Sequence, residues 1–249
     1  MIFKISIILF LSKQIFSNPI KLNQTSVLSK NPEEGLHFEG DIVGIQKGAN
    51  LIPQNPWPNG IVPYVIDSAF TQEQKNTIES ALRMVEQVTS VKGFYCIQFI
   101  PRTNQAEYIN VINSNGCWSY VGKVVSNGAQ TLSLQIPGCV HTGIVAHEFI
   151  HALGFLHEQS RPDRDDYISI NFENIISGME YNFNKYSTDQ IDYLGMAYDY
   201  DSIMHYGSKA FSKNGQLTIV SKNPNAKIGQ RETLSLMDIT EIRTFYKCF

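Results

Sequence analysis

Three histidines and a glutamate stand close together between residues 147 and 157. His147 and His151 are four residues apart, so on a helix they lie on one face, one turn from each other. Their ring nitrogens could then reach one metal ion at about 2.0–2.1 Å. Glu148 directly follows the first histidine, where its carboxylate could accept a proton from a water molecule on that ion. This spacing is typical of a catalytic metal site.

A third histidine, His157, can reach the same ion only if the helix ends before it. A continued helix would turn His157 by about 600° from His151 and move it about 9 Å along the axis, onto the opposite face. Gly154 can adopt a left-handed conformation and end the helix without Cβ strain. The glycine therefore makes three histidine ligands compatible with one metal ion per chain.

The ligand set favours catalytic zinc. Three neutral histidines leave a coordination position open, whereas a structural zinc is usually enclosed by four protein ligands. Copper and nickel also bind such nitrogens, so the choice of metal stays open on the residues alone. Zinc lowers the pKa of a bound water toward about 7 and polarises a carbonyl, and Glu148 would move the water's proton to a leaving amine. An isolated HExxH pattern also arises by chance, but here the glycine and the third histidine follow at the required offsets.

The metal residues need a helix and a sheet to hold them. The segment 142–153 suits a helix with an apolar side. Thr71 can cap a second helix, with Gln74 completing a capping box. Strands are expected at 61–66, 97–100, 108–112 and 131–136, and Pro63 predicts an edge or irregular position for the first of them. This order predicts an α+β lobe up to about residue 156.

The remainder of the chain has a different character. Residues 160–235 are rich in Asn, Asp, Tyr, Ser and Gly and show little periodicity, which predicts an irregular lobe. Helical spacing returns over 232–246, which predicts a terminal helix.

The beginning of the chain reads as a secretory signal over residues 1–17. Lys4 precedes a short apolar run that is too short to span a bilayer, although a buried N-terminal strand is an alternative. No later segment is apolar enough for a membrane anchor. Asn23, in an Asn-Gln-Thr sequence, is a possible glycosylation site. The four cysteines suggest two disulfides, with three pairings open, and a net charge of −3 gives no reason to expect nucleic-acid binding.

Two further motifs carry a family resemblance. Residues 159–165 (QSRPDRD) continue the histidine segment, and residues 202–206 (SIMHY) follow at a distance. With the Trp-Pro-Asn-Gly sequence at 57–60 and the cysteine positions, they make the chain resemble the astacin family of metzincin zinc endopeptidases over nearly all of 48–249. The resemblance implies a two-lobe catalytic domain, with a twisted sheet and two long helices in the N-terminal lobe and an irregular C-terminal lobe ending in a helix.

The resemblance also implies roles for residues outside the helix. Met204 would lie in a turn beneath the metal. Tyr206 would be a further zinc ligand that can swing away to stabilise an oxyanion. His205 and His141 are expected to be structural. The cysteines would pair as Cys96–Cys248 and Cys117–Cys139, and no EGF-like or CUB-like domain is expected after the last cysteine.

Residues 18–47 are expected to form an inhibitory pro-segment, followed by the peptidase domain at 48–249. Phe38-Glu39-Gly40-Asp41 resembles the inhibitory motif of the family, in which Asp41 would take the position on zinc that water needs. His37 as the ligand, or Asp41 as a solvated loop residue, are the alternatives. An activating protease is expected to cut after Lys47, and Glu158 would receive the new α-amino group near Gly48.

Arg231 lies downstream of Tyr206 and resembles an arginine linked to a preference for an acidic residue just after the cleaved bond. A guanidinium can hold a carboxylate through two charge-assisted hydrogen bonds, but a surface arginine with no pocket role is the alternative. The expected protein is thus a secreted, monomeric endopeptidase acting on protein or peptide substrates. A zinc-binding protein without catalysis is disfavoured by the retained Glu148, and a non-peptidase zinc hydrolase is a third possibility.

Overall fold

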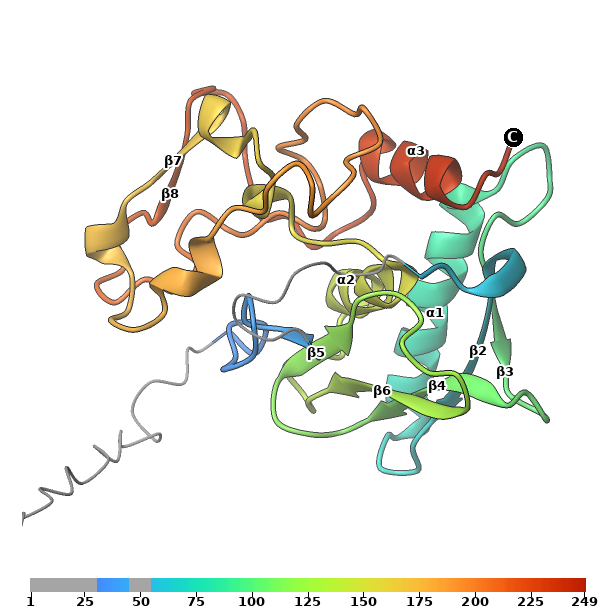
Figure 1. Cartoon of the computed structure of the whole chain (residues 1–249). Coiled ribbons are helices and arrows are strands. Elements are labelled where there is room, and N and C mark those ends of the chain that lie inside the picture. The colour runs from blue at the N-terminus through green and yellow to red at the C-terminus, as the bar shows by residue number, and fades with distance from the viewer. Residues whose placement is uncertain (1–30, 45–54) are drawn as a thin grey trace, which may run out of the picture.

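The computed structural model describes residues 31–44 and 55–249, in two lobes with helix α2 between them (Figure 1). The expected signal peptide, Asn23, Lys47 and Gly48 lie outside these ranges. Six strands form the main sheet in the order β1-β5-β6-β4-β2-β3, and only β5 and β6 are antiparallel. The strands are β1 (Ile42–Val43), β2 (Ile61–Ile66), β3 (Gln98–Pro101), β4 (Glu107–Ile112), β5 (Cys117–Tyr120) and β6 (Gly128–Leu134).

Pro63 predicts an edge or irregular position for β2, and the edge position is wrong for the strand as a whole. Strand β2 lies between β3 and β4 in the sheet. Pro63 is tolerated because the two neighbours pair with different parts of β2: β3 pairs with residues 61–64, and β4 pairs only from Tyr64 onward. The proline therefore faces one partner strand and not two, which keeps its missing N–H from breaking a two-sided ladder.

Two helices pack together beside this sheet. Helix α1 (Gln72–Thr89) begins at the Thr71 capping box that the sequence predicts, with the Gln74 N–H donating to the Thr71 hydroxyl (3.3 Å). Its apolar stripe is fully buried against the core. Helix α2 (Thr142–Leu153) has the bounds predicted from its sequence and is buried over almost its whole length. The buried stripe of α1 consists of Ile78, Ala81, Leu82 and Val85.

The C-terminal lobe is largely irregular, as expected, and has its own small core. Strands β7 (Ile168–Ile170) and β8 (Ile219–Ser221), which the sequence did not predict, pair antiparallel there. Short 3-10 turns occupy Glu158–Ser160, Arg164–Asp166, Phe172–Asn174 and Glu180–Phe183. The buried residues of this lobe are mostly aromatic or β-branched and include Ile168, Ile175, Phe183, Tyr198, Phe211 and Ile219.

Helix α3 (Leu236–Phe245) ties the two lobes together. It begins four residues later than the 232–246 spacing predicts, because Ser235 and Asp238 form a capping box at its N-terminus. The buried Asp238 carboxylate also accepts from the Ser202 hydroxyl (2.6 Å) and the Ile203 N–H (2.9 Å). The other end of α3 leads to the Cys96–Cys248 disulfide, which bonds the C-terminus to the N-terminal lobe.

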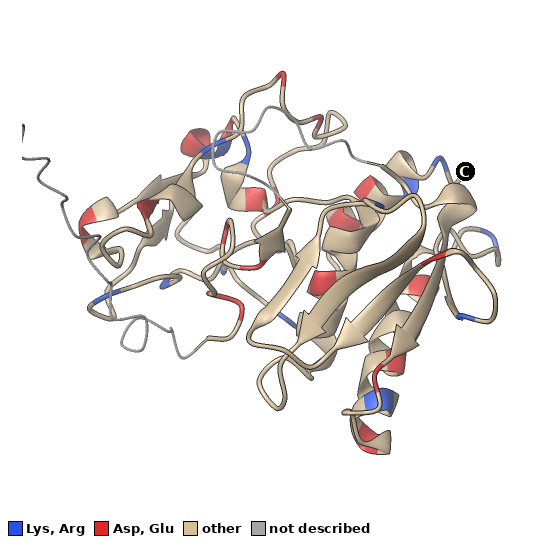
Figure 2. Cartoon of the chain, turned by 60° about the horizontal axis from the view of Figure 1, so that its bottom comes forward, with Lys and Arg blue, Asp and Glu red and all other residues tan. Residues whose placement is uncertain are grey.

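Charged residues of both signs are distributed along α1 and over the surrounding loops (Figure 2). Among the described residues, no helix combines the length and apolar character needed to cross a membrane.

Candidate metal centre

Helix α2 and the turn after it bring the three histidines together. His147 and His151 lie on one face of the helix, and Gly154 ends it with φ 118°, in the left-handed region that the sequence predicts. The Gly154 N–H donates to the His151 carbonyl oxygen (2.8 Å). The Trp57 indole N–H donates to the Ala152 carbonyl oxygen (2.9 Å), and this hydrogen bond fixes the last turn of α2. All three histidines are buried.

Each histidine has one ring nitrogen occupied by an oxygen acceptor. Nδ1 of His147 donates to the Ile203 carbonyl oxygen (2.9 Å), and Nδ1 of His151 donates to the Phe155 carbonyl oxygen (2.8 Å). Nδ1 of His157 donates to the Glu39 carboxylate (2.8 Å). These contacts fix the tautomers, because an oxygen acceptor requires a proton on Nδ1. The Nε2 lone pairs are therefore left free and directed to one point.

The spacing around that point fits zinc. Nε2 of His147 and Nε2 of His157 are 3.3 Å apart, and Asp41 oxygens lie 3.2, 3.5 and 3.3 Å from Nε2 of His147, His151 and His157. Four ligands at about 2.0–2.1 Å from a tetrahedral ion are separated by about 3.4 Å. Two imidazole lone pairs cannot hydrogen bond to each other, so either a proton on one ring or a shared metal cation must stabilise this contact. The four residues fit one zinc ion.

The pKa shifts of the charged groups at the site also favour a bound cation. Burial lowers the pKa of His147 to about 4, helped by the Arg231 guanidinium, which keeps this ring neutral as a ligand must be. Burial also lowers the pKa of His157, but the Asp41 and Glu39 carboxylates outweigh it and raise it to about 9. Burial alone would raise the pKa of Asp41, yet His157 and His151 bring it well below its usual range. The carboxylates thus favour a positive charge at this point, which a divalent cation provides.

Glu148 is positioned as a proton acceptor. Both carboxylate oxygens are buried and have no hydrogen-bond partner among the described residues. One of them lies within 4.8 Å of ligand atoms of His147 and Glu33. Burial raises the pKa of Glu148 well above its usual range, and the Asp41 and Glu33 carboxylates raise it further. A carboxyl group destabilised as an anion is suited to take up a proton.

Met204 and Tyr206 border the site. Met204 is buried in the main core, and its carbonyl oxygen accepts from the Glu158 N–H (3.1 Å), next to His157. The Tyr206 ring lies 4.7 Å from the His157 ring. Its hydroxyl donates to the Glu39 carbonyl oxygen (2.6 Å), so Tyr206 is bound to the segment 31–44.

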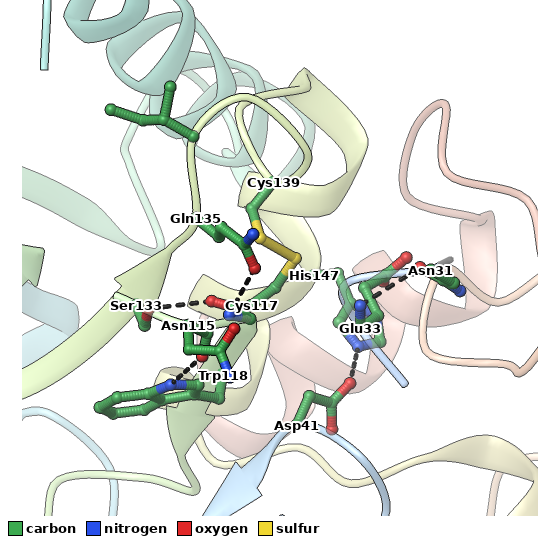
Figure 3. Close-up of a disulfide and its surroundings, with 12 residues drawn as sticks. Asn31, Glu33, Asp41, Asn115, Cys117, Trp118, Ser133, Gln135, Cys139 and His147 are labelled. Carbon is green, nitrogen blue, oxygen red and sulfur yellow. Dashed lines mark hydrogen bonds and ion pairs between the residues drawn. A yellow bond between two sulfur atoms is a disulfide. The ribbon is translucent and has the colours of Figure 1, made fainter. Parts of the chain in front are cut away.

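Residues 31–44 run through the site. Asp41 lies among the three histidines, whereas His37 packs against Trp118 with ring centroids 5.3 Å apart. Strand β1 pairs with β5, so Ile42 and Val43 cover the edge of β5. The second disulfide, Cys117–Cys139, lies beside this segment; Figure 3 shows it next to Glu33, Asp41 and His147. Both disulfides have the pairing that the resemblance implies.

Arg231 forms an ion pair. Its Nε donates to the Glu33 carboxylate at 2.6 Å, and its Nη1 donates to the Ile203 and His205 carbonyl oxygens (2.8 and 3.1 Å). This contact does not test the pocket role of Arg231, so that role and the alternative of a surface arginine with no pocket role both stay predictions. His205 itself is buried between the Tyr198 hydroxyl and the Tyr206 carbonyl oxygen, in a structural position, and His141 is exposed at the start of α2.

Glu158 borders a cavity of about 50 Å³ that Arg161, Tyr193, Glu241 and Phe245 also line. Its carboxylate accepts from the Asp199 N–H (2.7 Å) and from the Arg161 guanidinium (3.2 Å). Burial raises the pKa of Glu158 to about 8, against the effect of Arg161. A second cation in this cavity would therefore stabilise the carboxylate.

Sequence reasoning missed three positioning residues. The Gln159 side-chain oxygen accepts from the Tyr206 N–H (3.0 Å), and Asp238 holds the turn that contains Met204. Glu39 supports His157 from residues outside the peptidase domain. Only Asp238 had a recognisable signal, the Ser-x-x-Asp pattern of a capping box before an apolar run.

Comparison with known proteins identifies the family. A sequence profile described as Astacin, a peptidase family, matches residues 50–247. High choriolytic enzyme 2 of Oryzias latipes is 42% identical over 88% of this chain and 78% of its own length. The chain belongs to the astacin family of zinc metalloendopeptidases.

Other astacins support the same assignment. Zinc metalloproteinase nas-14 of Caenorhabditis elegans is 38% identical over 92% of this chain, and the chain spans half of that protein's length. The solved structure of high choriolytic enzyme 1, a hatching enzyme zinc-protease from Oryzias latipes, superposes with a TM-score of 0.69 at 45% identity. The superposition covers 78% of this chain and 94% of the solved one. These relationships confirm the α+β metzincin-like fold and the zinc cofactor.

The third zinc ligand can be tested directly. His157→Ala should remove one of three neutral nitrogens and reduce bound zinc from about one ion per chain to a small fraction after dialysis, measured by elemental analysis. His141→Ala is the matched control, because this exposed histidine lies outside the cluster and its loss should leave the zinc content unchanged. Equal zinc in both variants would show that residue 157 is not a ligand.

Proposed function

We propose that this chain is a secreted zinc endopeptidase that is synthesised as a latent zymogen. The observation that carries the proposal is the buried Asp41 carboxylate among three histidines whose Nε2 lone pairs converge. An aspartate in that position competes with the water that peptide hydrolysis needs. The relatives named as hatching enzyme and choriolytic enzymes support a role on protein substrates outside the cell.

His147, His151 and His157 hold the zinc ion. When bound, zinc supplies a Lewis acid that polarises the scissile carbonyl and acidifies water. Glu148 accepts the proton of the attacking water on one of its free carboxylate oxygens and delivers it to the leaving amine. The Tyr206 hydroxyl, once released from the Glu39 carbonyl oxygen, donates a hydrogen bond to the developing oxyanion.

The proposed precursor has a signal peptide at 1–17, an inhibitory pro-segment at 18–47 and the peptidase domain at 48–249, acting as a monomer. The pro-segment blocks substrate at two places, since Asp41 lies at the metal ligands and Ile42 and Val43 pair with the edge of β5. Substrate would bind along the same edge in extended form after the pro-segment is removed.

A catalytically silent zinc-binding protein is the competing function. It shares the fold and the histidines, so the general base decides between the two. Glu148 is retained, buried and free of other partners among the described residues, which favours catalysis.

Replacing Glu148 by Gln tests the peptidase function. The matured variant should keep about one zinc per chain, because the three histidines are unchanged, but lose at least ~10²-fold in kcat/KM on a peptide substrate for lack of a general base. Zinc content is measured beside activity, with matured wild type as the reference. A fully active Glu148→Gln enzyme would refute this mechanism, and an inactive wild type would favour the binding protein.

Replacing Asp41 by Ala tests latency. The unprocessed variant should hydrolyse a small peptide substrate at a measurable rate, whereas the unprocessed wild type should be silent, because only the variant leaves the fourth metal position to water. Mass spectrometry of the assayed samples ensures that neither has been cut. If both precursors are equally silent, Asp41 is not the inhibitory residue.

Maturation should produce a new N-terminus close to Gly48, after cleavage by a trypsin-like protease at Lys47. The α-ammonium group would enter the cavity beside Glu158, directly or through water, and pair with its buried carboxylate. Edman sequencing of the active form locates the terminus. Glu158→Gln should mature at the same bond but be less active than wild type; wild-type activity in this variant, or a terminus beyond Trp57, would contradict the assignment.

A further inference from the structure

Exposed aromatic side chains gather at one end of the N-terminal lobe, where the loop between α1 and β3 meets residues 246–249 (Figure 1). Phe94, Tyr95 and Phe249 are 78%, 57% and 87% exposed. Among the described residues, they are three of the four large hydrophobic side chains with the highest exposure. Apolar side chains that cluster in water mark a surface that another molecule covers.

The three aromatic residues line a hollow of about 480 Å³, called here the aromatic hollow. This volume lies within the range of about 300–1,000 Å³ that is usual for ligand sites. No residue of the segment 31–44 is among those that line it. Within the described ranges, the segment that covers the metal centre therefore leaves the aromatic hollow open.

A tight turn holds Phe94 in its exposed position. Val91 and Phe94 exchange two main-chain hydrogen bonds, both of 2.9 Å, around Lys92 and Gly93. These two residues have φ of 52° and 83°, and two positive φ values in succession are typical of a type I′ turn. A Cβ on Gly93 would meet no atom within 4 Å, so the turn projects into solvent. Phe94 is thus presented by a defined piece of backbone.

Two further bonds make the aromatic hollow rigid. Tyr95 directly precedes Cys96, which forms the disulfide with Cys248, so the two chain segments around the hollow are joined covalently. The Tyr246 hydroxyl donates to the Leu153 carbonyl oxygen (2.8 Å) at the end of α2, which fixes the hollow relative to that helix. A preformed site loses less conformational entropy when a partner binds.

The charge around the aromatic hollow favours an anionic partner. Lys92 and Lys247 are the charged residues among those that line it, and both are exposed. Figure 2 shows blue segments next to the end marked C. Ammonium groups beside apolar rings complement a partner that carries carboxylates together with an apolar side chain. A symmetric dimer through this surface is disfavoured, because it would place the lysines of two copies against each other.

The shape of the site favours a polypeptide over a lipid surface. A flat bilayer surface would leave the hollow unfilled, whereas a bulky side chain that projects from a polypeptide fills it. Apolar anchors that enter a pocket, with charged groups at its rim, are the usual arrangement where a few residues supply most of the binding energy.

We propose that the aromatic hollow is a docking site for an acidic polypeptide segment. The segment inserts one bulky apolar side chain between the exposed aromatic rings and places carboxylates on Lys92 and Lys247. The site is separate from the metal centre. The inference goes beyond the proposed function, because binding there needs no hydrolysis of a peptide bond.

Binding is measured with the full-length, unprocessed, zinc-loaded chain. The probe is an immobilised mixture of pentapeptides that have Asp or Glu at both ends, Phe or Leu in the middle and any residue except Cys at the other two positions. Two matched mixtures have Lys or Arg at both ends, or Ser in the middle. Retention on the acidic, apolar mixture should exceed retention on each of the others by roughly tenfold, as loss of one anchor or charge pair commonly costs that much.

The aromatic anchor is tested by Phe94→Ser combined with Tyr95→Ser. This variant should lower retention on the acidic, apolar mixture by roughly tenfold, because the rings that hold the apolar side chain are gone. Phe172→Ser is the control, since it removes an aromatic side chain that is 48% exposed in the C-terminal lobe, and it should change retention by less than about twofold. All three residues are exposed, so unchanged thermal unfolding midpoints check that the fold is kept.

The charge is tested by Lys92→Glu combined with Lys247→Glu. This variant should lose retention on the acidic mixture and gain it on the basic one, and added salt should weaken binding of the wild type. Lys213→Glu is the matched control, because it makes the same change at an exposed lysine of the C-terminal lobe. None of these measurements uses peptidase activity, so an inactive enzyme leaves them valid.

Several outcomes would overturn the docking site. Equal retention on the three mixtures would do so, as would full retention of the Phe94 and Tyr95 variant. Vesicles of phosphatidylserine and phosphatidylcholine that bind the wild type but not this variant, without retention on the peptides, would show a membrane surface as the occupant. Self-association in analytical ultracentrifugation that the same variant abolishes, again without retention on the peptides, would show a second copy of the chain.

Discussion

Three imidazole lone pairs that converge in a buried place are the constraint on which this structure depends. Each ring has its other nitrogen fixed by an oxygen acceptor, two of them backbone carbonyls. The rings therefore cannot relieve the contact by changing tautomer, and either a proton on one ring or a shared metal cation must make it favourable. The Asp238 contacts set the position of Ile203, and the Gly154 turn sets the position of Phe155. Both therefore help to orient the histidine rings at the metal site.

Residues 39–41 satisfy this constraint by supplying negative charge to the site. Asp41 brings a carboxylate to the cation, and Glu39 brings one to the outer nitrogen of His157. Two buried carboxylates would be costly alone, but a divalent cation and neighbouring imidazoles compensate them. In the proposed mature form, the removal of these carboxylates would change the charge around His157 and release the Tyr206 hydroxyl, so it would alter the electrostatics of the site as well as its access.

The local parts of the structure were predictable from the sequence, and the parts made by distant pairing were not. Helix α2, its end at Gly154 and the Thr71 cap follow from residues within one or two turns. The internal place of β2 could not be foreseen, since Pro63 is accommodated by where β3 and β4 begin to pair. The three histidines could be recognised because they are close in the sequence. The Glu39–His157 and Glu33–Arg231 contacts could not be. They join residues 118 and 198 positions apart, and no spacing rule covers such distances.

Arg231 offsets the negative charge that Glu33 brings close to Glu148. A carboxylate close to Glu148 raises the proton affinity of that base, and it would be repelled from an uncompensated site. The guanidinium compensates this charge and at the same time lowers the pKa of His147, which favours the neutral form that binds metal. Because Arg231 and His147 also share the Ile203 carbonyl oxygen, the turn before Met204 positions both the metal ligand and the guanidinium that faces Glu33. The Ile203 carbonyl oxygen thus connects the Arg231–Glu33 ion pair to the metal centre.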